Sequence, residues 1–171
     1  MARQSYKSLL YASVKYRDRR DAYCRDVFVR AERGIKIKYS EETNMDINIR
    51  KATKADLAAI EGIYDRILTE EERGRAKIGW VRGVYPTRAT AEAALEADEL
   101  FVEEADGRVV GVAIINGKQV DAYAGAPWMY DVPDSRITVL HTLVIDPLAA
   151  GRGLGTAFVS FYERYAAERG C

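Results

Sequence analysis

The most informative part of this sequence is the stretch 143–156, which reads Leu143-Val144-Ile145-Asp146-Pro147-Leu148-Ala149-Ala150-Gly151-Arg152-Gly153-Leu154-Gly155-Thr156. It begins with the end of an apolar run. The Asp-Pro pair that follows ends a strand, because proline offers no N–H to a sheet. The glycines then lead into residues with helical apolar spacing, namely Leu154, Ala157, Phe158, Phe161, Tyr162 and Tyr165. The stretch therefore predicts a buried strand, a tight glycine loop and the start of a helix.

The predicted loop has the chemistry of a phosphate-binding site. The first turn of a helix leaves unpaired N–H groups and a positive dipole end, and glycines let a diphosphate approach the backbone closely. Arg152 adds one positive charge, and Thr156 offers a hydroxyl to the same oxygens. Two other nucleotide motifs fit poorly, because a Walker loop ends in Gly-Lys-Ser/Thr and the dinucleotide fingerprint has Gly or Ala where Thr156 stands.

The residues after position 45 begin with the signals of a strand and two helices. Ile47 and Ile49 alternate with polar residues, as in a half-buried strand, and residues 53–56 form a capping-box pattern. The apolar residues of the helix that follows are Leu57, Ile60, Tyr64, Ile67 and Leu68. Either Thr87 or Thr90 caps a second, alanine-rich helix.

Strands follow these helices. Apolar runs at 100–102 and 109–115 flank Asp106-Gly107, a pair typical of a two-residue hairpin because both turn positions favour positive φ. After a polar connection, the apolar run 137–145 is a candidate central strand. The predicted order is strand, helix, helix, strand, strand, strand and helix.

The N-terminal part differs from the rest in charge. Residues 1–44 hold 11 Lys and Arg against 6 Asp and Glu, whereas residues 45–171 hold 15 against 20. The pattern from about Tyr6 to Glu32 predicts a helix ended by Gly34, and alternation then predicts a strand that includes Ile35, Ile37 and Tyr39. We therefore expect a basic, partly helical extension at 1–44 and a main domain at 45–171.

Composition excludes several classes of site. The single histidine, His141, rules out a multi-histidine metal cluster, and two cysteines, Cys24 and Cys171, are too few for a disulfide framework. We expect both cysteines to be free thiols and no metal to be bound. No window has the ~18 consecutive apolar residues of a membrane helix, and the N-terminus lacks a secretory signal, so a cytoplasmic location is expected.

The stretch 143–156 resembles the acetyl-CoA signature of the GNAT superfamily of N-acetyltransferases. That signature is an apolar strand, a proline and Arg/Gln-x-x-Gly-x-Gly/Ala opening a helix, and the order of elements agrees from about Ile47 to Cys171. The resemblance implies an α/β fold with a mixed, mostly antiparallel sheet flanked by helices. Two departures stand out: Ala150 occupies the usual Arg or Gln position, and the family continues beyond Cys171 into a strand, a helix and often a last strand. We therefore expect the domain to be incomplete at its C-terminal end.

The same resemblance implies how acetyl-CoA binds as a cosubstrate. Backbone groups of Leu143 and Ile145, with Val144 between them, would bind the pantetheine arm. The diphosphate would be held by Ala150, Gly151, Arg152, Gly153, Leu154, Gly155 and Thr156. In such enzymes a primary amine attacks the thioester directly, and backbone N–H groups of the strand stabilise the developing oxyanion.

His141 is the candidate catalytic base, since an attacking amine must lose a proton and imidazole titrates near neutral pH. Strict alternation would place it on the same face as Leu143 and Ile145. A structural histidine is the alternative. Five loop aromatics would line the acceptor pocket or simply cover the core: Trp80, Tyr85, Tyr123, Trp128 and Tyr130. Tyr162 and Tyr165 are expected to pack against the core.

Two other functions stay open at this point. The chain could be a non-catalytic acyl-CoA-binding module, or residues 1–44 could form an arm that binds a partner or RNA. We expect the acceptor to be a small-molecule or peptide amine, with no nucleic-acid or membrane partner. A homodimer is the one assembly that we consider.

Overall fold

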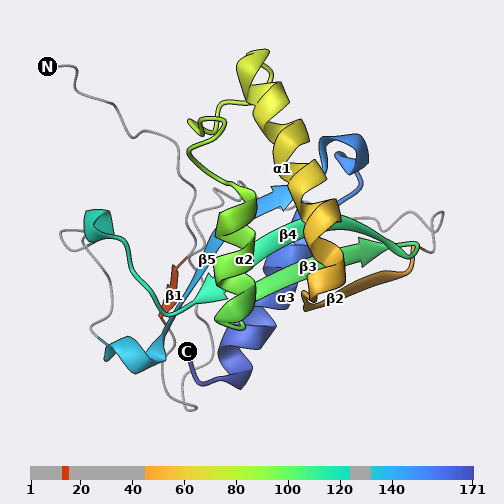
Figure 1. The fold of residues 1–171 in the computed structure, drawn as a ribbon. Coiled ribbons are helices and arrows are strands. Elements are labelled where there is room, and N and C mark those ends of the chain that lie inside the picture. The colour runs from red at the N-terminus through yellow and green to blue at the C-terminus, as the bar shows by residue number, and fades with distance from the viewer. Residues whose placement is uncertain (1–12, 16–44, 124–131) are drawn as a thin grey trace, which may run out of the picture.

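The computed structural model describes residues 13–15, 45–123 and 132–171 (Figure 1). Within the predicted helix of residues 6–32, only Ser13–Lys15 are described, and they form a short strand, β1, that pairs with residues 137–139. The helix prediction is wrong at these three residues, because long-range backbone pairing overrides local propensity. The rest of that helix and the predicted strand at 35–39 lie outside the described residues.

The remaining strands form one sheet with β1. They are β2 (Ile47–Lys51), β3 (Leu100–Ala105), β4 (Arg108–Asn116) and β5 (Ile137–Ile145). Their order is β1-β5-β4-β3-β2, and all described pairings are antiparallel. The prediction of a mixed sheet is therefore corrected to an antiparallel sheet among the described strands. From β2 to β5, each connection returns the chain to the end of the sheet at which the previous strand finished, so consecutive strands run in opposite directions. The 137–145 strand lies inside the sheet, between β1 and β4, as the apolar run predicted, and β4 is the middle strand of the five.

Local signals placed the turns and helix starts well. Asp106 and Gly107 both have positive φ, 52° and 74°, which confirms the predicted hairpin turn between β3 and β4. The Asp56 carboxylate accepts hydrogen bonds from the Thr53 N–H (2.7 Å) and hydroxyl (2.9 Å). Thr87, not Thr90, is the N-cap of the second helix, and its hydroxyl accepts the Thr90 N–H at 3.2 Å.

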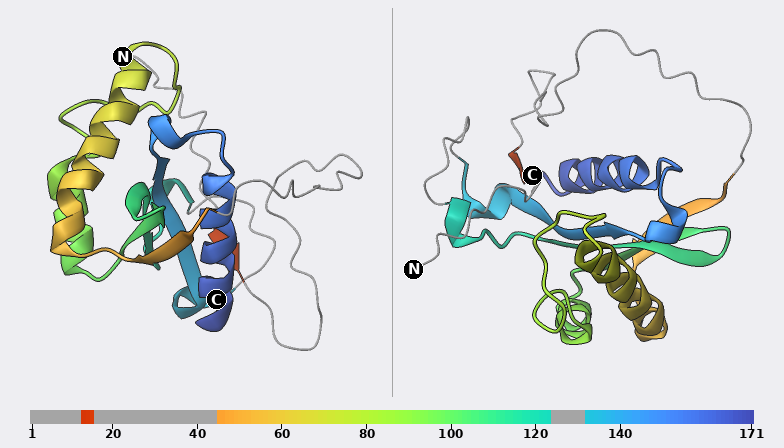
Figure 2. Two further views of the ribbon diagram at one scale, coloured as in Figure 1. Left: turned by 90° about the vertical axis from the view of Figure 1, so that its right-hand side faces the viewer. Right: turned by 90° about the horizontal axis from the view of Figure 1, so that it is seen from above.

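Helices cover both faces of the sheet (Figure 2). They are α1 (Leu57–Glu72) and α2 (Arg88–Glu96) on one face and α3 (Leu154–Glu168) on the other. The predicted apolar face of α1 is confirmed, with Leu57, Ile60, Tyr64 and Leu68 buried. Packing roles are also confirmed for Tyr162, whose hydroxyl donates to the Thr138 carbonyl (2.7 Å), and for Tyr165, which contacts Phe101. None of the helices in the described ranges has the length and apolarity to cross a membrane.

Candidate functional site

The glycine loop joins β5 to α3 as predicted. A single 3-10 turn, Pro147–Ala149, follows the strand, and Gly153 then caps the helix. Gly151 and Gly153 have φ values of 81° and 79°, in the left-handed region that strains any residue with a Cβ. A Cβ added at either position would meet nothing within 4 Å, so the two glycines border open space.

Helix α3 points its N-terminal donors into this loop. The Ala157 N–H donates to the Gly153 carbonyl (3.0 Å), so the N–H groups of Leu154, Gly155 and Thr156 lie ahead of the hydrogen-bond ladder. The first turn of α3 contains no acidic residue that would oppose an anion. These donors and the positive end of the helix dipole make the loop suitable for a phosphate group.

The charge of Arg152 is shared with a neighbouring carboxylate. Its Nη2 lies 3.6 Å from Asp106 in the β3–β4 turn, and both side chains are exposed. An exposed pair of this kind is weak, so it leaves Arg152 able to turn toward an anion. Ala150 and Thr156, which flank the predicted diphosphate site, are also exposed.

An ion pair that the sequence did not reveal anchors the start of the loop. Arg66 of α1 donates to both carboxylate oxygens of Asp146, at 2.8 and 2.7 Å. Asp146 is buried and also accepts the Leu148 N–H at 3.0 Å. Such two-point guanidinium–carboxylate pairs fix orientation, so the loop is tied to α1 as well as to β5. The only local signal was an aspartate before proline at a chain turn.

The outer edge of β5 exposes backbone groups next to this loop. The Asp146 N–H donates to the Val110 carbonyl (2.7 Å) and Val144 pairs with Val112, so these residues direct their backbone groups toward β4. Alternation then directs those of Leu143 and Ile145 away from β4. Among the described strands, none pairs with this edge beyond residue 139. An extended ligand can therefore bind beside residues 143–145 as an additional strand would.

A β-bulge interrupts β5 just before this edge. Ile114 pairs with His141, whereas Val112 pairs with Val144, so β5 carries one extra residue. Thr142 has φ 52°, is buried, and shares a hydrogen bond with the Tyr85 hydroxyl. Tyr85 thus links the loop between α1 and α2 to the bulge.

The bulge corrects the predicted orientation of His141. His141 pairs with Ile114 of β4, and paired residues of neighbouring strands lie on the same face of a sheet. Ile114 is buried beneath α1 and α2, so His141 lies on the α1/α2 face. Leu143 and Ile145 pack on the opposite face, with Phe158 of α3. Strict alternation failed here because the bulge inserts a residue between them.

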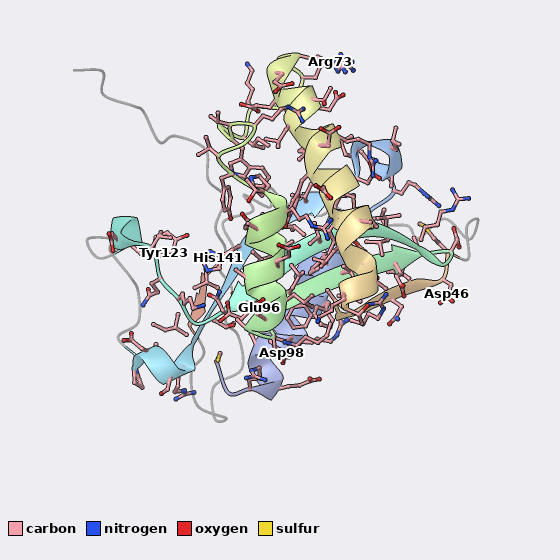
Figure 3. The ribbon with its side chains drawn as sticks, viewed as in Figure 1. Asp46, Arg73, Glu96, Asp98, Tyr123 and His141 are labelled. Carbon is pink, nitrogen blue, oxygen red and sulfur yellow. The ribbon has the colours of Figure 1, made fainter. Side chains whose placement is uncertain are left out.

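His141 is half-buried and hydrogen-bonded. Its Nε2 lies 3.1 Å from the Asn116 Oδ1 and 3.1 Å from the Lys118 carbonyl oxygen. Burial lowers the pKa of the imidazole, so the neutral form is favoured near pH 7. In Figure 3, His141 lies toward the end of the sheet opposite to Asp46.

Two of the predicted aromatic residues meet on the same side of the sheet as His141. The rings of Trp80 and Tyr85 make an edge contact with centroids 5.7 Å apart. Tyr123 lies in a short 3-10 turn, Asp121–Tyr123, and Trp128 and Tyr130 lie outside the described residues. The described aromatics of the predicted acceptor pocket therefore include one contacting pair.

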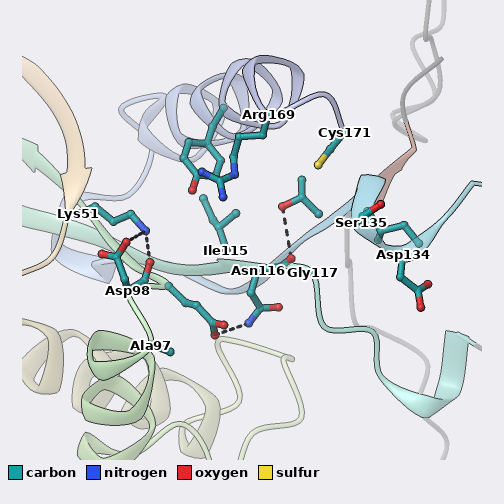
Figure 4. Close-up of a pocket in the computed structure, with 14 residues that line it drawn as sticks. Lys51, Ala97, Asp98, Ile115, Asn116, Gly117, Asp134, Ser135, Arg169 and Cys171 are labelled. Atoms are coloured by element: carbon teal, nitrogen blue, oxygen red, sulfur yellow. Dashed lines mark hydrogen bonds and ion pairs between the residues drawn. The ribbon is translucent and has the colours of Figure 1, made fainter. Parts of the chain in front are cut away.

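A separate cavity of about 710 Å³ lies at the far end of α3 from the glycine loop (Figure 4). Its lining includes Asn116 from β4, Thr138 from β5 and Arg169 after α3. The buried free thiol of Cys171 also borders it, and Cys24 lies outside the described residues. None of the predicted cofactor residues lines this cavity.

Comparison with known families gives a match over most of the main domain. A model described as "Acetyltransferase (GNAT) family" matches residues 61–171. No curated protein matches the chain. The matched range includes the glycine loop, the bulged strand, α2 and the part of α1 from residue 61 onward.

Solved structures share the fold at low sequence identity. A GNAT-family acetyltransferase from Streptococcus agalactiae 2603 has 19% identity and a TM-score of 0.57, and the match covers 67% of this chain and 66% of that chain. A Staphylococcus aureus Mu50 protein has 20% identity, a TM-score of 0.56, and coverage of 72% and 74%. A Salmonella typhimurium protein solved with its cofactor acetyl-CoA has 23% identity, a TM-score of 0.49, and coverage of 72% and 65%. The chain thus spans just under two thirds of the length of the first of these structures.

Proposed function

Because the chain belongs to the GNAT family of acetyltransferases, we propose that it transfers an acetyl group from acetyl-CoA to a primary amine. The observation that carries this proposal is the continuous arrangement of the open β5 edge, the glycine loop and the N-terminus of α3. Strand-edge groups suit an amide-rich pantetheine arm, and the helix N-terminus suits a diphosphate. A small-molecule or peptide amine is the proposed acceptor.

Different residues would bind each part of acetyl-CoA and stabilise the charge that develops during the reaction. Backbone groups of Leu143 and Ile145 bind the pantetheine arm, and residues 150–156 hold the diphosphate. When bound, acetyl-CoA supplies the activated thioester. Backbone N–H donors at the bulged strand stabilise negative charge that develops on the thioester oxygen, and they need no reorganisation because the strand is rigid.

His141 is the proposed base for the attacking amine. Its support is that it shares the α1/α2 face with the contacting pair Trp80–Tyr85, one residue before the bulge at Thr142. An imidazole kept neutral near pH 7 is able to accept a proton.

Acetyl-CoA should raise the thermal stability of the protein, because a ligand that binds only the folded state stabilises it. At 100 times the dissociation constant we expect about 2.7 kcal/mol, a shift of roughly 5–10 °C for a domain of this size. S-acetylpantetheine, which lacks the diphosphate, is the matched ligand and should give a much smaller shift. An absent shift with acetyl-CoA would contradict the proposal. Release of free thiol on a panel of primary amines then separates turnover from binding without catalysis.

The substitution His141→Gln should lower kcat by about a hundredfold, the usual contribution of a positioned base. In the natural protein, kcat at saturating acceptor should fall with acidity, with a midpoint below the ordinary histidine value of 6.5 because burial lowers the pKa. The variant should lose this acidic limb. Glutamine retains an amide N–H for Asn116 and Lys118, so folding is expected to persist. A limb that survives in His141→Gln would remove His141 from the mechanism.

A further inference from the structure

The His141 imidazole is the end of a hydrogen-bonded chain that begins at a carboxylate. Glu99, between α2 and β3, accepts a hydrogen bond from the Asn116 Nδ2 at 2.8 Å (Figure 4). Asn116, the last residue of β4, places its Oδ1 3.1 Å from the His141 Nε2. Three residues from separate parts of the sequence are therefore joined end to end.

The orientation of the Asn116 amide is determined by its neighbours. Its Oδ1 also accepts the Lys118 N–H at 2.9 Å, while its Nδ2 faces the Glu99 carboxylate. The opposite orientation would place Nδ2 against an N–H group and Oδ1 against a carboxylate, which are two repulsive contacts. An acceptor oxygen therefore faces His141.

Two acceptors at Nε2 determine where the neutral imidazole carries its proton. The Asn116 Oδ1 and the Lys118 carbonyl accept hydrogen bonds and cannot donate them, so Nε2 must be the N–H. The lone pair then belongs to Nδ1. The Glu99 carboxylate is only 20% exposed and pairs with the Lys118 ammonium at 2.9 Å, which keeps the turn after Asn116 in place.

We propose that Asn116, oriented by Glu99, is a positioning residue that holds His141 as the tautomer protonated at Nε2. The consequence for catalysis rests on the proposed function, in which the Nδ1 lone pair accepts the proton of the amine. A histidine without this constraint populates both tautomers, and only one of them presents the lone pair on the required nitrogen.

The test uses the fact that His141 is the only histidine of the chain, so one imidazole spectrum reports on it without assignment. In untagged, uniformly ¹⁵N-labelled protein, two-bond ¹H–¹⁵N correlation at pH 8 should show the Nε2–H tautomer. The variant Asn116→Ala removes one acceptor at Nε2, and it also removes the Oδ1 that binds the Lys118 N–H and so keeps the Lys118 carbonyl in place. It should therefore show a mixture of both tautomers. The kcat of this variant should fall roughly tenfold with KM unchanged, because His141 is still present but only one of its two tautomers carries the lone pair on Nδ1.

Two further variants keep the test decisive if Asn116→Ala folds poorly. Glu99→Gln retains an acceptor for the Asn116 amide and should keep the Nε2–H tautomer. Glu99→Leu removes both this acceptor and the partner of the Lys118 ammonium, so it loosens both groups that accept from Nε2 and should show a mixture of tautomers. Asn116→Asp keeps an acceptor beside Nε2, and its added negative charge should raise the pKa of His141.

Three results would overturn the inference: an Nδ1–H tautomer in the natural protein, an unmixed Nε2–H tautomer in Asn116→Ala, or an unmixed Nε2–H tautomer in Glu99→Leu. The tautomer is read without any acetyl transfer. If it responds as expected while His141→Gln retains the acidic limb, the positioning inference stands and the proposed base is wrong.

Discussion

Replacement of Gly153 by alanine is expected to weaken coenzyme A binding at least tenfold and to destabilise the fold by about 1–2 kcal/mol. Gly153 has φ 79° and caps α3, so an alanine there must either adopt a strained left-handed conformation or shift the start of the helix. A shift would move the N–H groups of Leu154 and Gly155 away from the proposed diphosphate. Calorimetric titration with coenzyme A and urea unfolding would measure the two effects.

Gly74 provides the matched control for this experiment. It follows α1, has φ 71°, and, like Gly153, would place a Cβ in open space. Gly74→Ala therefore carries the same backbone strain outside the proposed site, and it should lose similar stability while binding coenzyme A normally. Equal affinity losses in the two variants would attribute the Gly153 effect to instability and contradict the proposed diphosphate site.

The strand, glycine loop and helix start of the proposed site could be predicted from the sequence because local signals determine them. A strand that stops at Asp-Pro and a helix that starts after Gly153 are set by φ preferences and hydrogen-bonding groups of adjacent residues. The Asp106-Gly107 turn is determined in the same way. These signals act between neighbouring residues, so the strand, loop and helix of the proposed site were predicted with their boundaries.

The environment of His141 could not be predicted in this way. The bulge at Thr142 arises from the pairing of β5 with β4, in which residues 23 or more positions apart set the register. Local alternation has no information on an inserted residue, and so it placed His141 on the wrong face. The Glu99–Asn116–His141 chain could not be predicted either. These polar residues form no sequence motif, and only the folded sheet brings them together.

Glu103 is another feature that only the structure reveals. Its side chain is 0% exposed in the interior of β3, and within the described residues neither carboxylate oxygen has a hydrogen-bond partner. The carboxyl group lies over Gly111 of β4, where an added Cβ would approach its Oε2 to 2.9 Å. Burial raises the pKa of the Glu103 carboxyl to about 7.

This burial predicts a strong dependence of stability on pH. Since the pKa of Glu103 is higher in the folded state than in the unfolded chain, its protonated form is favoured by folding. The associated stability is present below pH 4.5 and is lost as pH rises through about 7. From pH 5 to pH 8 the natural protein should lose roughly 2–3 kcal/mol of unfolding free energy through this group.

The variant Glu103→Gln should therefore be more stable than the natural protein at pH 8 and should lack this part of the pH dependence. Glutamine has nearly the same shape and stays neutral at both pH values, so the comparison isolates the cost of a buried charge. Glu96→Gln, at an exposed carboxylate that ends α2 (Figure 3), is the control and should follow the natural protein. Urea unfolding at pH 5 and pH 8 measures all three proteins. Parallel losses in the natural protein and Glu103→Gln would mean that the carboxyl is hydrated or paired in solution and that its burial does not govern the acid–base behaviour of the fold.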